Sequence, residues 1–330
     1  METIVITEEV MTFDESKQLL GEWPIESHIQ QWFDPQVDTK FIFRTSLGDN
    51  VIAGIKKQVY KGQVYDEIKE CLLSIDDTTT MRANCAGPVD TDELDRQGIE
   101  YELRTKNSYK TVDGNGKVSA IAQGNPIHSV MMGYKRGRFT GKIDKSGWSK
   151  NNPEKNFILS RIPNINDKAY KELAPVEFEC QKSFAETSIA PNHRIGGGIH
   201  TTLSANKYSP DGSPKMSYHI DSGDLDGGLT TIATFLEGDV KTYFVLPRYG
   251  IAIARGDGDV FVGDSGQVHG VIDIEGEGIS MNVVSYCDTR LATKGNMGKP
   301  EKLIGKKARE AKPTLERFFL DKTTGSKLNG

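Results

Sequence analysis

Ser217-Tyr218-His219-Ile220-Asp221 is the stretch of this sequence from which the fold can be recognised. On a β-strand, residues two apart point to the same face, so His219 and Asp221 present an imidazole and a carboxylate together. A second histidine, His269, follows a short apolar run and stands at the start of another expected strand. A barrel that closes over these strands brings His269 beside the first pair.

The part of the chain from about residue 197 onward consists of short apolar runs separated by Gly, Asp, Pro and Asn. Hairpin loops are indicated at Leu246-Pro247-Arg248-Tyr249-Gly250 and at Arg255-Gly256-Asp257-Gly258-Asp259. We expect strands at 199–205, 216–220, 229–236, 242–246, 250–254, 260–262, 269–272 and 279–286. This pattern predicts an α+β, mainly β fold whose core is a double-stranded beta-helix, the cupin-like jelly roll.

The remaining sequence predicts elements that flank this core. An amphipathic helix is expected at 59–74, and residues 1–125 are interpreted as a support region of helices and strands. A second helix is expected at 167–185, with Pro175 near its first turn. The jelly-roll core is placed at 126–290, wrapped by N-terminal helices, and residues 291–330 form a basic tail.

Composition limits the class of protein and its partners. The chain has 330 residues, of which 36% are hydrophobic and 26% charged, which is typical of a globular protein. Its formal net charge is −5, so a nucleic-acid partner must be bound by local contacts. The four cysteines show no metal-binding spacing, and no export signal or membrane-spanning stretch is recognised. We therefore expect an intracellular protein, cytoplasmic or nuclear, without a membrane partner.

Two histidines and one carboxylate on one face form the facial triad that holds Fe(II) in non-haem oxygenases and leaves other positions open. His219, Asp221 and His269 are thus the candidate metal ligands and catalytic residues. An H-x-D tripeptide alone is weak evidence, because it is common in proteins without a metal. The surrounding order of motifs makes the assignment more specific.

That order resembles the Fe(II)- and 2-oxoglutarate-dependent oxygenases. Their pattern is matched by His219-x-Asp221, then Gly258-Asp259-Val260, then His269-Gly270, over roughly residues 195 to 290. Within this superfamily, Gly227-Gly228 and Phe244-Val245-Leu246-Pro247 look most like the TET/JBP branch, which oxidises 5-methylpyrimidine bases such as 5-methylcytosine in DNA. The resemblance implies Fe(II), 2-oxoglutarate and O₂ as the reaction partners, and oxidation of a methyl group.

One feature departs from the family pattern. Relatives bind the distal carboxylate of 2-oxoglutarate with an Arg or Lys on the strand after the second histidine, but residues 270–284 contain neither. Either a cation elsewhere replaces this anchor, or the co-substrate is different, for example ascorbate. The replacement candidates are Arg194, Lys207, Arg248, Arg255 and Arg290, and further co-substrate contacts are expected from Asn206, Tyr208 and Asp224.

The substrate stays open at this stage. Basic segments at 134–155 and 294–309, with Tyr134, Phe139 and Trp148 as stacking residues, suit a methylated DNA base flipped into the site, but they also suit a solvated surface. The alternatives are an iron-dependent hydroxylase of a protein side chain or small metabolite, and a non-catalytic jelly-roll binding module. The sequence does not indicate the oligomeric state.

Overall fold

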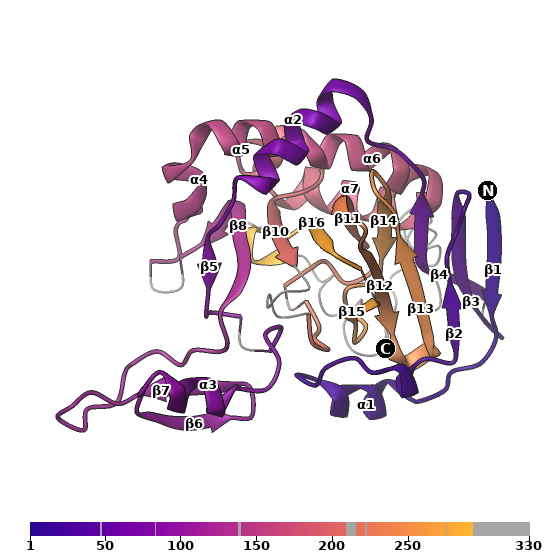
Figure 1. Cartoon of the computed structure of the whole chain (residues 1–330). Helices are drawn as coiled ribbons and strands as arrows, with labels where there is room; N and C mark the ends of the chain where they lie inside the picture. The colour runs from indigo at the N-terminus through magenta and orange to yellow at the C-terminus, as the bar shows by residue number, and fades with distance from the viewer. Residues whose placement is uncertain are drawn as a thin grey trace, which may run out of the picture.

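Two β-sheets face each other at the centre of the molecule. The computed structural model describes residues 1–46, 48–82, 84–137, 140–208, 216–221, 223–274 and 276–292. Within them the large sheet has the order β1-β3-β4-β14-β11-β16-β10-β8-β5, with β9 paired to β8, and the small sheet has the order β15-β12-β13-β2. A separate hairpin of β6 and β7 projects from the body together with α3 (Figure 1).

The strands of the large sheet are β1 (Glu2–Ile6), β3 (Thr39–Thr45), β4 (Gly48–Lys56), β5 (Thr78–Thr79), β8 (Ile127–Arg136), β9 (Ile143–Lys145), β10 (Thr202–Tyr208), β11 (Thr230–Gly238), β14 (Val260–Gly263) and β16 (Gly278–Tyr286). Those of the small sheet are β2 (Gln31–Phe33), β12 (Lys241–Leu246), β13 (Ile251–Arg255) and β15 (Gly270–Ile274). The projecting hairpin comprises β6 (Tyr101–Thr105) and β7 (Ser108–Thr111).

The expected double-stranded beta-helix is formed by β10 to β16. In the large sheet β14, β11, β16 and β10 are neighbours and pair antiparallel, and opposite them β12 pairs with both β13 and β15. Seven of the eight expected strands are present with small shifts at their ends. The jelly-roll core predicted from the sequence is confirmed.

The strand expected at 216–220 is the exception. This segment makes an isolated bridge between His219 and His269, and Met216 O accepts from Val271 N–H of β15 (2.9 Å), but two of its N–H groups donate to loops outside the sheets. Tyr218 N–H donates to Glu22 O (2.9 Å), and Ser217 N–H donates to Cys85 O (3.0 Å). N-terminal loops therefore take the hydrogen bonds that a strand in mid-sheet would give to its neighbours.

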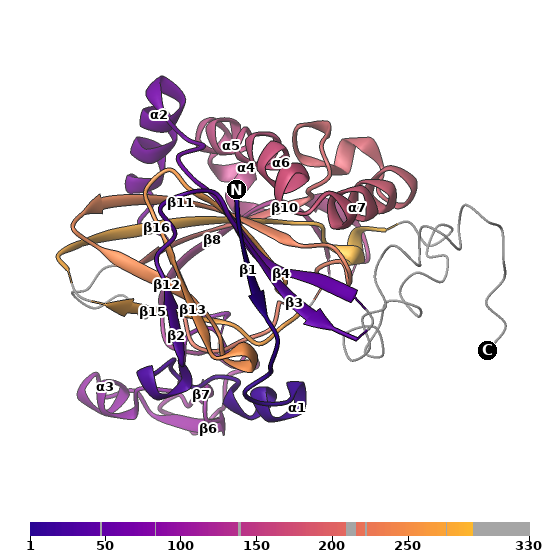
Figure 2. The ribbon, with the colours of Figure 1, turned by 90° about the vertical axis from the view of Figure 1, so that its right-hand side faces the viewer.

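Helices cover the outer face of the large sheet, as both ribbon views show (Figures 1 and 2). They are α2 (Gly62–Leu73), α4 (Gly147–Asn151), α5 (Pro153–Leu159), α6 (Ile162–Leu173) and α7 (Pro175–Ser188), while α1 (Phe13–Ser16) and α3 (Thr91–Arg96) lie elsewhere. The helix predicted at 59–74 corresponds to α2. Helices α4 to α7 belong to the connection between β8 and β10, so most of this layer does not come from the N-terminal region.

The single helix predicted at 167–185 is wrong, because the chain forms two helices there. Ala174 has φ −144° and ψ 69°, outside the helical region, and Pro175 is the first residue of α7. Proline has no N–H to donate and disfavours helical geometry in the residue before it. The break lets α6 and α7 turn and pack against each other.

The N-terminal region contributes strands to both sheets. β1, β3 and β4 extend the large sheet beyond β14, and β2 pairs in parallel with β13. The boundary expected near residue 125 stays a prediction, as do the other expected domain limits. Most of the basic tail expected at 291–330 falls outside the described residues. None of the helices in the described part of the chain combines the length and apolar composition that crossing a lipid bilayer requires.

The helix layer and the sheet share a continuous apolar core that includes Leu173, whose side chain is fully buried. We expect Leu173→Ala to lower the free energy of unfolding by about 2–5 kcal/mol, because it leaves a cavity beneath the large sheet. Urea denaturation measures this loss. Phe157→Ala is the matched control, since Phe157 is 73% exposed and its truncation should cost less than about 0.5 kcal/mol. Equal losses in the two variants would contradict this packing.

Candidate metal centre and cavity

The structure brings the three candidate ligands together at one end of the jelly roll. His219 Nε2 lies 3.8 Å from Asp221 Oδ1, and His269 Nε2 lies 3.8 Å from Asp221 Oδ2. The two imidazole rings are 4.3 Å apart between centroids, and all three ligand atoms fall within 4.8 Å of one another. Among the described residues, this is the group of His, Cys, Asp and Glu side chains placed to hold a metal ion.

Backbone carbonyls fix the orientation of both rings. His219 Nδ1 lies 2.7 Å from Ser217 O, and His269 Nδ1 lies 2.9 Å from Gln267 O. A proton on each Nδ1 satisfies these carbonyls and makes Nε2 the atom of each ring that can bind a metal, which is the arrangement of metal-binding histidines. The residues present therefore fit a divalent cation such as Fe(II).

The sequence His269-Gly270 has a steric reason. A Cβ atom at position 270 would lie 2.7 Å from Pro24 Cγ and 3.1 Å from the ring of Tyr218. Beside it, the ring of Phe244 stacks on His269 with 5.0 Å between centroids and an angle of 15° between planes. Close packing on both sides thus holds His269 in place.

The two histidines differ in their affinity for protons. Burial, together with the charge on His219, lowers the pKa of His269 to about 4, so this ring is neutral. Burial also acts to lower the pKa of His219, but the Cys85 sulfur and the Asp221 carboxylate outweigh it and raise that pKa to about 9. A metal ion bound at His219 must displace this proton, so metal binding is favoured at higher pH.

Hydrogen bonds support the loop that carries Asp221. The N–H of Asp221 donates to Ser265 O (3.1 Å). The hydroxyls of Ser265 and Thr230 each donate to Asp224 Oδ2 (2.6 Å). Burial and the charge of Asp221 raise the pKa of Asp224 to about 8. Asp224 thus ties the metal loop to β11 and to the turn before His269.

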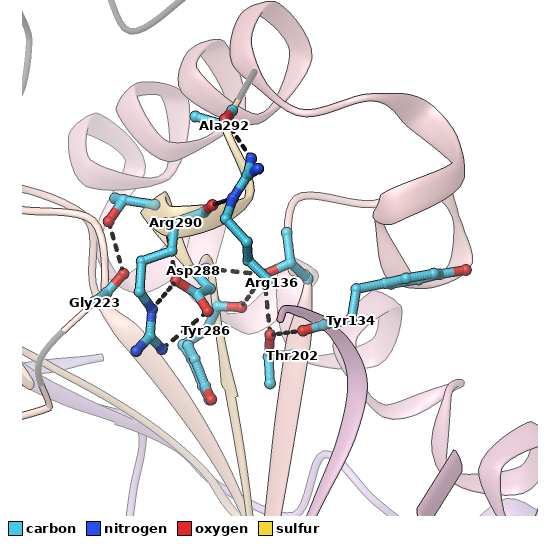
Figure 3. Close-up of polar contacts among 10 residues, drawn as sticks. Tyr134, Arg136, Thr202, Gly223, Tyr286, Asp288, Arg290 and Ala292 are labelled. Atoms are coloured by element: carbon cyan, nitrogen blue, oxygen red, sulfur yellow. Dashed lines mark hydrogen bonds and ion pairs between the residues drawn. The ribbon is translucent and has the colours of Figure 1, made fainter. Parts of the chain in front are cut away.

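The segment after β16 also makes hydrogen bonds to this loop, at Gly223 (Figure 3). Within η6 (Thr289–Leu291), the N–H and hydroxyl of Thr289 both donate to Gly223 O, at 2.8 and 3.0 Å. Arg136 on β8 donates to Arg290 O (2.5 Å) and to Ala292 O (3.0 Å), which holds η6 against the sheet. Gly223 lies between Asp221 and Asp224 in the sequence, so the hydrogen bonds from Thr289 hold the backbone beside the metal ligand Asp221.

A cavity of about 430 Å³ opens beside the three ligands. Its lining includes all four of the expected co-substrate residues: Asn206, Tyr208, Asp224 and Arg290. Asn206 accepts hydrogen bonds through Oδ1 from Ser129 (2.7 Å) and Ser204 (3.2 Å), so its amide NH₂ is what it can offer to a ligand. Whether these four residues bind a co-substrate stays a prediction.

The five candidate anchors named from the sequence differ in whether they line the cavity. Lys207 pairs with Asp76 (2.7 Å) and Arg248 pairs with Glu9 (2.6 Å), and neither they nor Arg194 line the cavity. Arg255 and Arg290 do line it. From the sequence, Arg255 was one of five candidate anchors, and neither the stacking of Phe244 on His269 nor the contact of Gln267 O with His269 was expected. The two-residue spacing of Gln267 and His269 could have suggested the carbonyl contact.

The expected stacking residues of the basic segment at 134–155 lie away from the metal ligands. Tyr134 packs against His193, and Trp148 donates from Nε1 to Asp77 (3.2 Å). Neither lines the cavity, Phe139 is not among the described residues, and the segment at 294–309 lies outside them as well. The described residues therefore give no support to stacking by this segment at the cavity.

Comparisons with known proteins agree with the resemblance seen in the sequence. No protein-family model matches the chain. The chain is similar to the bifunctional helicase and thymine dioxygenase JBP2 of Trypanosoma brucei brucei, with 31% identity over 124 residues, which cover 36% of this chain and 11% of that protein. It thus spans only about a tenth of this relative.

Among solved structures, the chain is similar to NgTET1 in complex with 5mC DNA, with a TM-score of 0.52, 13% sequence identity, and coverage of 86% of this chain and 94% of the other. It is more loosely similar to OsALKBH1, with a TM-score of 0.34, 14% identity, and coverage of 71% and 96%. The likeness to NgTET1 supports the jelly-roll fold, and together with JBP2 it confirms the similarity to the TET/JBP branch.

Replacing either histidine by alanine should remove a ligand and lower the affinity for Co(II), a spectroscopic substitute for Fe(II), by at least about a hundredfold. The absorption bands of bound Co(II) report this affinity directly. His128→Ala serves as the matched control, because His128 lies outside the cavity lining and should bind Co(II) as the unaltered chain does. Co(II) binding that survives in both His219→Ala and His269→Ala would place the metal elsewhere.

Proposed function

We propose that this protein is an Fe(II)-dependent dioxygenase that oxidises the methyl group of a 5-methylpyrimidine base in DNA, with 2-oxoglutarate and O₂ as co-substrates. The observation that carries the proposal is the convergence of His219, Asp221 and His269 on one cavity inside a jelly roll. Similarity to the thymine dioxygenase JBP2 and to NgTET1, solved with 5mC DNA, supports the choice of substrate.

Bound Fe(II) would supply activation of O₂, and the protein would supply geometry. His219, Asp221 and His269 would occupy one face of the metal and leave the cavity side to the co-substrates. The resemblance implies the overall balance: one oxygen atom of O₂ enters the methyl group as hydroxyl, and the other enters succinate as 2-oxoglutarate loses CO₂. The hydrogen bond from Asp221 N–H to Ser265 O would keep the carboxylate that holds the metal in place.

The cavity walls suit a flipped base. A base that leaves the duplex needs an apolar pocket for its ring and polar groups for its edges. Phe244, Ile232, Val284 and Met131 provide apolar surface, while Ser204 and Asn206 provide hydrogen-bonding groups. At the exposed end, the lining includes Met81, which is 65% exposed, and the side chain of Arg290, which is 59% exposed.

Arg82 is a further cation of the lining, next to Met81 on the loop before Cys85. Together with Arg290 it offers positive charge to the phosphates on either side of a flipped nucleotide. The chain as a whole carries a net charge of −5, so binding must depend on such local contacts. DNA affinity should therefore fall as salt is added, with a slope that reflects few phosphate contacts.

Turnover on methylated DNA tests the proposal. Duplex oligonucleotides that carry 5-methylcytosine, or the same sequence with thymine as the only methylated base, are incubated with the purified chain, Fe(II) and 2-oxoglutarate, and the nucleosides are analysed by mass spectrometry. We expect a hydroxymethyl product and an equal amount of succinate. Asp221→Ala should reduce both by at least about a thousandfold, because the metal loses its carboxylate ligand, whereas His128→Ala should not.

The outcome separates the alternatives. Succinate formed without oxidised nucleoside, in amounts independent of DNA, would indicate an oxygenase of a protein side chain or small metabolite. If oxidised nucleoside forms with ascorbate when 2-oxoglutarate is omitted, ascorbate and not 2-oxoglutarate is the co-substrate. A chain that binds no metal at all would be a jelly-roll binding module, and the proposal would be wrong.

A further inference from the structure

The arginines that line the cavity differ sharply in exposure. In the described lining these are Arg82, Arg255 and Arg290. The Arg290 side chain is 59% exposed and makes a bidentate ion pair with Asp288, at 2.8 and 3.0 Å. Arg255 is only 2% exposed and is among the largest fully buried side chains of the chain. Arg255 therefore marks the inner end of the cavity, and Arg290 marks its rim.

Strand register places Arg255 relative to the metal ligands. β12 and β13 pair antiparallel, with Phe244 opposite Ile253 and Thr242 opposite Arg255. Arg255 Nη2 lies 3.4 Å from Thr242 Oγ1, so the two side chains share a face. Residues two apart on a strand also share a face, so Thr242 and Arg255 lie on the side of β12 that carries Phe244.

The direction along β12 is also fixed. Val245 pairs with Gly270 and Phe244 with Val271, so His269 comes opposite Leu246, at the other end of β12 from Thr242. The ring of Phe244 stacks on His269. One two-residue step separates Phe244 from the level of Thr242 and Arg255, which is roughly 6.8 Å along an antiparallel strand. Two such steps separate the level of His269, opposite Leu246, from the level of Arg255, and both residues line the cavity. The long Arg255 side chain and a five-carbon dicarboxylate held at the metal ligands would together bridge this interval.

The large sheet provides amides across from this level. Asn206 and Asn282 are paired in register on β10 and β16, and both line the cavity while being 4% and 1% exposed. Asn282 Oδ1 accepts from Thr234 Oγ1 (3.0 Å), and its Nδ2 donates to Ser280 Oγ (2.9 Å). The inner end of the cavity is thus polar, with a guanidinium on one wall and amides on the other.

We propose that Arg255 binds the distal carboxylate of 2-oxoglutarate, and that this anchor has moved from the strand after the second histidine to the end of β13. The inference rests on the proposed function. The first residues of β16, Gly278-Ile279-Ser280-Met281, include no cation that could bind this carboxylate. A guanidinium is always charged and matches a carboxylate with two parallel hydrogen bonds, which makes Arg255 a residue that selects a dicarboxylate co-substrate over ascorbate.

Equilibrium dialysis without O₂ tests this assignment on the Mn(II)-loaded chain, in which no turnover occurs. The probes are 2-oxoglutarate and 2-oxovalerate, which has the same carbon chain but lacks the distal carboxylate. The unaltered chain should prefer 2-oxoglutarate by about tenfold to a hundredfold, as a charged hydrogen-bonded pair allows. In Arg255→Gln this preference should fall to about threefold or less, while affinity for 2-oxovalerate stays close to that of the unaltered chain.

The comparison of two probes separates loss of the anchor from general damage. A preference that persists in Arg255→Gln would overturn the proposal, and so would its loss in Arg290→Gln instead, which would assign the role to the rim. If Arg255→Gln does not bind Mn(II), Arg255→Met carries the test: its side chain is long and flexible but has no positive charge, so an undiminished preference would refute the role of Arg255.

Failure of the proposed function has a different signature. An unaltered chain that does not bind Mn(II) would refute the metal centre itself. An unaltered chain that binds Mn(II) but shows no preference for 2-oxoglutarate over 2-oxovalerate would leave the metal centre intact, refute the anchor, and favour a co-substrate without a distal carboxylate.

Discussion

The backbone bridge between His219 and His269 is the contact on which the site depends. His219 N–H donates to His269 O (2.8 Å) and His269 N–H donates to His219 O (3.0 Å), so two residues fifty positions apart in the sequence are held in register. In an antiparallel bridge, opposite residues place their side chains on one face. The bridge therefore sets the two imidazoles side by side, and Asp221, two residues on, completes the group.

The cavity beside this bridge has two unlike ends. The inner end is formed by buried polar residues, among them Arg255 and Asn282, whereas the outer end is formed by exposed residues such as Met81. A small charged co-substrate suits the first end and a large substrate suits the second. In the proposed function, this division would let the co-substrate and the DNA base occupy the cavity together, because each approaches from its own end.

Local spacing predicted the core of the molecule. H-x-D on one face, a histidine before a strand, and regular turns at Gly and Asp are properties of neighbouring residues, so they can be read from the sequence. The layout of the first 125 residues depends on pairing between distant segments, such as β2 with β13, and carries no local signal. Arg255 was named from the sequence only as one of five candidate anchors: it ends an apolar strand beside a turn, and only barrel closure shows that it lines the cavity. Asp224 lines the cavity, but the sequence does not reveal its hydroxyl partners, because Thr230 begins β11 and Ser265 lies in the turn before His269.

The central claim is that His219, Asp221 and His269 hold one Fe(II) and leave open positions toward the cavity. An anaerobic visible-absorption titration with Fe(II), followed by 2-oxoglutarate, tests it most directly, because a charge-transfer band arises only when the 2-oxo acid chelates the bound iron. We predict such a band at one Fe(II) per chain. Iron that binds without the band would contradict the assigned co-substrate, and a chain that takes up no iron would contradict the metal centre.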